Sequence, residues 1–403
     1  MPPPEAGAQP AAAVAPGRLV VALVVGQLGL HATMAGVRMA AALQALREGH
    51  TAWAVGVLLA LFAAAPVLTA MHAGRMTDRR GYHPVVYAAV LLAMLGAGAA
   101  VGSTWAQGPW HLGLLCLAAM CTGTAANVGV LAIQRTAGAS VRSDLERVRV
   151  FSWLGVAPPL ANVIGPVAAG FMIDGFGFAA AYALMLVLPL ATWATARRVP
   201  RLPPAGAAGG AGQGNALTLL RLPAMRRLLL VNWLLSSCWD VHAFAIPLLG
   251  HERGMSASNV GLILGIFTLA VTGVRMLIPL LAHRVTEAQV MRYAMLGTGA
   301  VFAAYPLAPN AWVMALLAAL LGLSLGSVQP MLMSLLHQVT PEARHGEALA
   351  MRSMAMNATS TVMPLLFGAS GAVVGAGVLF WAVGALVAAG AWLPRHIVGT
   401  RAD

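Results

Sequence analysis

Apolar residues along this chain are gathered into long blocks, and short polar runs separate one block from the next. A block of roughly 20 to 28 residues, coiled as a helix that rises about 1.5 Å per residue, crosses the roughly 30 Å apolar core of a bilayer. The pattern therefore predicts an all-α membrane protein. We expect twelve transmembrane helices, at residues 19–46, 52–73, 84–103, 110–135, 149–173, 178–196, 225–250, 256–283, 289–308, 311–338, 347–371 and 373–393.

Composition supports the lipid bilayer as the surroundings of the chain. Of 403 residues, 59% are apolar and 9% are charged, and the mean hydropathy is +0.79. A soluble globule of this length needs more polar surface. The isoelectric point near 11.2 invites a nucleic-acid partner, but the 24 basic residues are scattered between apolar blocks, so we expect no nucleic acid. The odd set Cys116, Cys121 and Cys238 lies in apolar blocks and predicts no disulfide framework.

A polar stretch rich in Arg, Pro and Gly divides the apolar blocks into two groups of six. If both termini are cytoplasmic, 20 of the 24 arginines lie on that side, whereas Arg47 and Arg253 lie outside and Arg38 and Arg275 lie within helices. The positive-inside rule favours this orientation, in a bacterial inner membrane. The predicted parts are a disordered cytoplasmic tail (1–17), a six-helix bundle (18–196), a cytoplasmic linker (197–224), a second six-helix bundle (225–394) and a cytoplasmic tail (395–403).

The polar run at residues 74–84, between the second and third blocks, carries the pattern Gly-x-x-x-Asp-Arg-x-Gly at Gly74, Asp78, Arg79 and Gly81. We expect a turn there, since glycine permits tight turning. The pattern resembles the signature loop of the major facilitator superfamily. The resemblance implies a fold of twelve helices in two pseudo-symmetric bundles, and a cytoplasmic gating loop in which Asp78 holds the halves together in one state. An ordinary cytoplasmic turn is the alternative.

The fifth block carries a second resemblance, to the Gly-x-x-x-Gly-Pro-x-x-Gly-Gly pattern of facilitator antiporters. Ala161, Gly165, Pro166 and Gly170 fill its positions, with alanine at the first and at residue 169. The resemblance implies a seal against ion leak, and exchange rather than uniport. A packing face of small residues is the alternative. The fourth block departs from drug-proton antiporters, because it contains no arginine and its main polar residue is Asn127.

A few polar side chains lie inside apolar blocks, where charges are costly and face a partner or a cavity. His31 and Asp240 lie at matching depths in the first and seventh helices, and we expect Arg275 to be deep enough to pair with Asp240. Helical spacing aligns Gln27 and Arg38 with His31, and Ser236 with Asp240. Helix-to-helix hydrogen bonding is the alternative role for the neutral residues. The candidates for proton coupling and substrate binding are Asp240, Arg275, His31, Gln27, Arg38, Asn127, Ser236 and Gln329.

These observations predict a secondary transporter that moves a small organic compound by alternating access, with proton-coupled efflux as the expected direction. The alternative is a proton-coupled importer of a small organic acid whose carboxylate pairs with Arg38 or Arg275. The sequence contains no zinc-protease, hydrolase or ATP-binding motif, so we expect neither enzymatic activity nor a cofactor. We also expect the protein to function as a monomer. A minor alternative is a copper importer with soft ligands at Met331, Met333, Met351, Met354, Met356, Met363 and His337.

Overall fold

The computed structural model describes residues 16–140, 144–200, 216–281, 286–341 and 344–398, and every regular element among them is a helix. The N-terminal half contains α1 (Pro16–Arg47), α2 (Ala52–Arg80), α3 (Tyr82–Ser103), α4 (Pro109–Ser140), α5 (Asp144–Leu154), α6 (Ala157–Phe176) and α7 (Phe178–Ala196). The C-terminal half contains η1 (Ala216–Arg221), α8 (Pro223–Glu252), α9 (Ala257–Leu281), α10 (Glu287–Ala304), η2 (Tyr305–Leu307), α11 (Ala311–Val339), α12 (His345–Ala389), η4 (Gly390–Trp392) and α13 (Arg395–Val398).

These elements form twelve membrane-crossing segments, but the crossings and the helices do not correspond one to one. The fifth is made of α5 and α6 together, and the long α12 contains the eleventh and twelfth, which Gly375 separates with a φ of +77°. Among the described residues, ten helical stretches are long and apolar enough to cross a membrane by themselves. The helix α10 and the first part of α12 are not among these stretches. Both are more polar: α10 contains Glu287 and Arg292, and the first part of α12 contains Glu347, Arg352 and the run Asn357-Ala-Thr-Ser-Thr361.

The expected turn at residues 74–84 is much shorter in the structure. The helix α2 continues through Gly74, Asp78 and Arg79 to Arg80, and α3 begins at Tyr82. The only break is Gly81, whose φ of +74° lies in the region that glycine adopts without strain. The turn itself is present, but its predicted extent was wrong, because α2 continues to Arg80 and Gly81 alone separates it from α3. The side chain of Asp78, on which the gating prediction depends, lies outside the described part of the structure.

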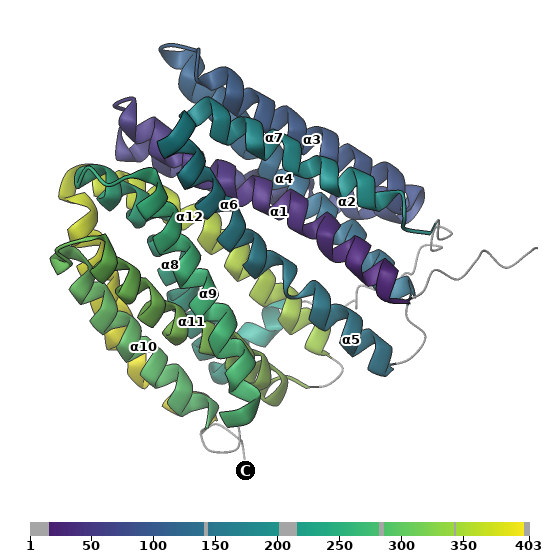
Figure 1. Ribbon diagram of the computed structural model, residues 1–403. Helices are drawn as coiled ribbons and strands as arrows, with labels where there is room; N and C mark the ends of the chain where they lie inside the picture. Colours follow the sequence, from purple (N-terminus) through teal and green to yellow (C-terminus); the bar gives the residue numbers. More distant parts are fainter. Residues whose placement is uncertain (1–15, 141–143, 201–215, 282–285, 342–343, 399–403) are drawn as a thin grey trace, which may run out of the picture.

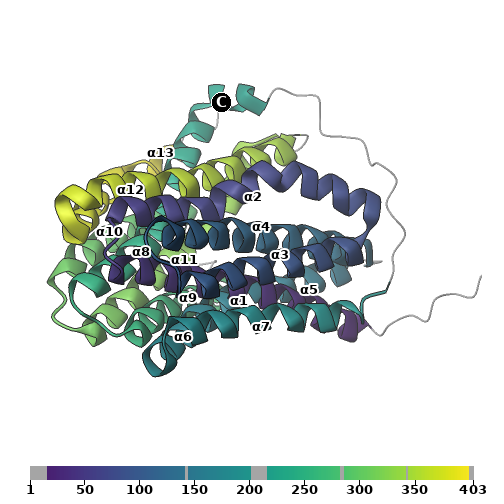
Figure 2. The ribbon, with the colours of Figure 1, turned by 90° about the horizontal axis from the view of Figure 1, so that it is seen from above.

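The two halves form two bundles of helices that lie side by side (Figures 1 and 2). Two pairs of helices connect them: α6 packs on α9, and α2 packs on α12. The fifth crossing of one half thus meets the second crossing of the other, and the second meets the fifth. This exchange of positions is what a two-fold pseudo-symmetry requires. The first helices of the halves, α1 and α8, also touch, in the interior of the molecule.

Candidate functional site

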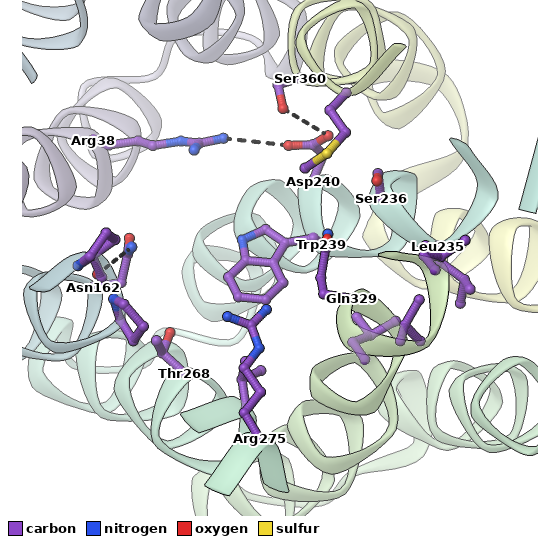
Figure 3. A pocket seen from close by; sticks show the side chains of 17 residues that line it. Arg38, Asn162, Leu235, Ser236, Trp239, Asp240, Thr268, Arg275, Gln329 and Ser360 are labelled. Atoms are coloured by element: carbon purple, nitrogen blue, oxygen red, sulfur yellow. Dashed lines mark hydrogen bonds and ion pairs between the residues drawn. The ribbon is translucent and has the colours of Figure 1, made fainter. Parts of the chain in front are cut away.

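A cavity of about 320 Å³ lies between the two halves (Figure 3). Its volume lies at the lower end of the range for small-molecule sites, about 300 to 1,000 Å³. Helices of both halves contribute to its wall, namely α1 and α6 from the first and α8, α9, α11 and α12 from the second. The lining residues are Arg38, Pro158, Pro159, Asn162, Leu235, Ser236, Trp239, Asp240, Thr268, Val271, Arg275, Leu325, Val328, Gln329, Leu332, Met356 and Ser360.

An ion pair joins the halves across this cavity. Nη2 of Arg38 on α1 lies 4.0 Å from Oδ1 of Asp240 on α8, and the hydroxyl of Ser360 on α12 donates to Oδ2 of Asp240 at 3.4 Å. The side chain of Asp240 is only 5% exposed, whereas that of Arg38 is 26% exposed. A carboxylate buried to this degree depends strongly on its partners, because removing a partner leaves an uncompensated charge.

The predicted pairing of Asp240 with Arg275 is wrong in this structure, because Arg38 occupies the place of the partner. Depth explains the difference. Asp240 lies about 12 residues before the end of α8, and Arg275 lies about 18 residues into the antiparallel α9, so Arg275 is roughly 9 Å further along the bundle. Nε of Arg275 instead donates to the carbonyl of Gly326 on α11, at 3.5 Å.

Five of the eight candidate residues meet at the cavity: Arg38, Ser236, Asp240, Arg275 and Gln329. The other three, Gln27, His31 and Asn127, lie on α1 and α4 and are not part of its lining. Each of these three has a buried polar atom without a partner among the described residues, namely Gln27 Oε1, His31 Nδ1 and Asn127 Oδ1. Their role stays a prediction. Of the methionines and the histidine predicted as copper ligands, Met356 alone lines the cavity, so these residues do not form a copper site there.

Four lining residues that could act on a substrate were not candidates from the sequence: Asn162, Trp239, Thr268 and Ser360. Trp239 directly precedes Asp240, and Asn162 lies one helical turn before Pro166. Both could have been predicted from their positions next to candidate residues. Nδ2 of Asn162 donates to the carbonyl of Pro158 at 2.9 Å. Thr268 and Ser360 carry no such signal, since short hydroxyl side chains are common in membrane helices and usually bond to their own backbone.

Comparison with known proteins decides the family. The model of the Major Facilitator Superfamily matches residues 21–286 and, separately, residues 228–401. The chain belongs to the major facilitator superfamily. As a member of this family it is a transporter in a lipid bilayer and not an enzyme. The second match covers the C-terminal half alone, as expected of a fold built from two similar halves.

Individual relatives agree with this assignment. The class B tetracycline resistance protein of Escherichia coli is 26% identical over 326 residues, which cover 77% of each chain. Among solved structures, a POT family transporter matches with a TM-score of 0.76 and 11% identity, over 95% of this chain and 96% of the other. A D-xylose-proton symporter matches with a TM-score of 0.74 and 14% identity, over 94% and 97% of the two chains. These two likenesses concern the fold.

The small residues of the antiporter-like motif place α6 in close contact with two neighbours of this facilitator fold. A side-chain carbon on Gly165 would lie 2.5 Å from the carbonyl oxygen of Ala32 on α1, and one on Gly170 would lie 2.5 Å from that of Ala257 on α9. Ala161 is fully buried, and the carbonyl of Pro166 abuts Gly261 on α9. The helix α6 is therefore wedged between its own half and the other half. This is the close approach that small residues allow; the sealing role stays a proposal.

The halves are closed at the end of the molecule where α1 ends and α2 begins. Backbone meets backbone there in both connecting pairs of helices, with Gly56 on α2 against Gly368 on α12, and Gly170 on α6 against Ala257 on α9. The cavity lies beyond these contacts, towards the opposite end. Pro158 near the start of α6 and Arg275 in the later part of α9 both line it.

A carboxylate also links the halves at this closed end. Oδ1 of Asp174, near the end of α6, accepts from the backbone N–H of Ala257 at 2.9 Å, and Oδ2 accepts from that of Ser258 at 2.7 Å. These N–H groups open α9 and lack partners within their own helix, and the helix dipole there favours a negative charge. Asp174 therefore caps a helix of the other half, and the cap must break if the halves part at this end.

Proposed function

We propose that this facilitator exports a small organic compound in exchange for protons by alternating access. The observation that carries the proposal is the Arg38–Asp240 pair, because it joins the two halves at the wall of the cavity between them. A carboxylate in this position can bind a proton in one conformational state and pair with an arginine in the other. Its protonation state is thereby coupled to the arrangement of the halves.

The exchange follows from the two forms of Asp240. The charged form attracts Arg38 and stabilises the arrangement in which α1 and α8 are held together. Proton binding removes that attraction and frees the guanidinium, so the halves can rearrange. In an antiporter, the proton enters from outside as substrate leaves, and it is released to the cytoplasm as the next substrate binds. Proton and substrate thus use the cavity in turn.

Efflux is supported by two features of the chain. The relative with 26% identity is a tetracycline resistance protein, and α6 carries the antiporter-like run from Ala161 to Gly170 in a tightly packed position between α1 and α9. Import of a small organic acid stays the alternative, because the cavity contains two arginines against a single aspartate.

We place both termini in the cytoplasm of a bacterium, with the protein in the inner membrane and active as a monomer. The closed end then faces outwards, and the cavity reaches towards the cytoplasm. The turn between α2 and α3 also lies on the cytoplasmic side, where Arg135 at the end of α4 donates to the carbonyl of Thr77. In this arrangement Asp78, Arg79 and the glycines Gly74 and Gly81 act as the cytoplasmic gate, which closes when the outer end opens.

Transport by the purified protein in proteoliposomes tests the proposal. A panel of cationic drugs and organic anions is loaded at the cytoplasmic face, and a proton gradient with the acidic side outside is imposed. We expect efflux of at least one class of compound to accelerate with the gradient and to fall to the passive rate when an ionophore dissipates it. A flux that does not depend on the gradient would contradict proton coupling, and gradient-driven movement of the compound into the cytoplasm would support the importer instead.

Removing the helix cap at the closed end is expected to favour opening to the outside. Loss of a capping side chain costs about 0.5 to 2 kcal/mol, so Asp174→Ala should raise the population of the outward-open state about fivefold. The readout is the rate at which an impermeant maleimide labels Ala243→Cys from outside, in a background without the three native cysteines. Ala243 lines a small cavity next to the closed contacts.

Glu252→Ala is the matched control for this variant. Glu252 also accepts from a backbone N–H, that of Ala376 at 3.4 Å, but both residues belong to the C-terminal half. The labelling rate should therefore stay at the wild-type value. Equal rates for Asp174→Ala and the wild-type protein would show that the cap does not hold the outer end closed.

A further inference from the structure

Charge inside the cavity is unbalanced. Its lining contains two arginines, Arg38 and Arg275, and a single carboxylate, Asp240, which lies beside Arg38. No carboxylate among the described residues lies within ion-pair distance of Arg275. A charged arginine within a membrane helix is costly unless an anion or water compensates it. The cavity therefore has a place for one further negative charge.

The position of Arg275 suits it to bind that charge. Its hydrogen bond among the described residues runs from Nε to the carbonyl of Gly326, and at 3.5 Å this is a weak bond. Figure 3 shows the guanidinium extending from α9 into the cavity, whose wall also includes Trp239. The terminal nitrogens remain as donors in a planar fork, which matches the two oxygens of a carboxylate or phosphonate.

A second polar group beside it also offers donors. Arg352 on α12 donates to Oε1 of Gln329, which lines the cavity. Because arginine has no acceptor, this contact fixes which end of the amide faces Arg352 and leaves the NH₂ of Gln329 to donate elsewhere. Arg275 and Gln329 thus favour a group that is rich in acceptors.

The remaining wall is apolar and includes Leu235, Trp239, Val271, Leu325, Val328 and Leu332. Such a wall fits a hydrocarbon or aromatic body, and the cavity of about 320 Å³ limits its size. We propose that the substrate is a small amphipathic organic anion whose acid group binds Arg275 and whose apolar body packs against Trp239. This inference rests on the proposed transport function and assigns its substrate class, whichever direction transport takes.

Binding to the purified protein in detergent tests this assignment without any transport. The probes form two matched series, one built on naphthalene and one on biphenyl. Each series contains a carboxylate, the corresponding neutral amide and the corresponding methylammonium cation. We expect each carboxylate to bind about 10- to 100-fold more tightly than its amide, which is the effect of one charge-assisted hydrogen-bonded pair, and the cations to bind most weakly.

Variants identify the group that makes this distinction. Arg275→Gln should bind each acid and its amide with equal affinity, and Arg275→Lys should keep part of the preference because the charge remains but the planar fork is lost. Arg226→Gln is the control, since Arg226 is an exposed arginine at the start of α8, outside the cavity. Its preference should equal that of the wild-type protein.

Two results overturn the inference: a wild-type protein that binds neither acid more tightly than its amide, and an Arg275→Gln variant that keeps the full preference. The failure of the inference and the failure of the proposed function are distinguishable in proteoliposomes. Gradient-driven transport of the cations, without preferential binding of the acids, would support the proposed transport function and refute an anionic substrate. Preferential, Arg275-dependent binding of the acids without gradient-driven flux would support the anion site and refute proton coupling.

Discussion

The Asp240→Asn variant is expected to lose gradient-driven transport completely while it retains exchange of substrate for substrate. Asparagine has nearly the shape of aspartate and still accepts from Ser360, but it carries neither a titratable proton nor a charge for Arg38. Uphill transport requires the proton to bind and leave, whereas counterflow moves no net proton. Both are measured in proteoliposomes, the first with an imposed proton gradient and the second with equal pH and labelled substrate.

Ser360→Ala serves as the control for Asp240→Asn, since it removes the second partner of the carboxylate and leaves the titratable group in place. Gradient-driven transport should persist in this variant, with an altered pH dependence. A normal proton dependence in Asp240→Asn would make Asp240 a structural partner of Arg38. The coupling would then have to be sought at another polar site, with His31 on α1 as the first choice.

The Arg38→Ala variant is expected to be the least stable of the changes at the ion pair. It leaves a carboxylate of 5% exposure without its cation, and breaking a buried pair in this way costs about 3 to 5 kcal/mol. Asp240→Asn leaves Arg38 unpaired instead, and this side chain is 26% exposed, so its loss of stability should be smaller. Thermal unfolding of the purified protein in detergent measures the order.

The double variant Arg38→Ala/Asp240→Asn should regain most of the lost stability, because no uncompensated charge remains. The deficit of Arg38→Ala should also shrink as the pH falls, since protonation of Asp240 removes the unpaired charge, and it should grow as the pH rises. Additive losses in the double variant, or a deficit that does not depend on pH, would show that the two side chains do not act as a pair.

The sequence predicted the scaffold well because membrane helices are specified by length and apolar composition. The twelve crossings and the family followed from blocks of apolar residues and two short motifs. The predicted ends of helices were wrong where polar residues continue a helix beyond its apolar block. Residues 74–80 are polar enough to resemble a turn, yet they continue α2, because at a membrane surface a helix can extend into water without any change in its hydrogen bonding.

The site was predicted in part, for a related reason. Helical spacing states which residues share a face. The cavity wall contains Arg38, Ser236 and Asp240, but it does not contain Gln27 and His31, which the same spacing had aligned with Arg38. Helical spacing does not state which helices meet, or how far one is shifted along another. For this reason Arg275, and not Arg38, was predicted as the partner of Asp240. In the structure Arg275 on α9 lies about six residues deeper along the bundle than Asp240 on the antiparallel α8.

Proton-coupled efflux by this protein requires above all that Asp240 carries the coupled proton. The direct measurement is proton movement during substrate efflux in proteoliposomes without an imposed pH gradient, recorded with a trapped pH dye and a compound that the wild-type protein transports. We expect wild-type vesicles to acidify inside in proportion to the substrate that leaves, and Asp240→Asn vesicles to show no pH change while they still exchange substrate. Equal acidification in the variant would contradict the assignment of the coupled proton to Asp240.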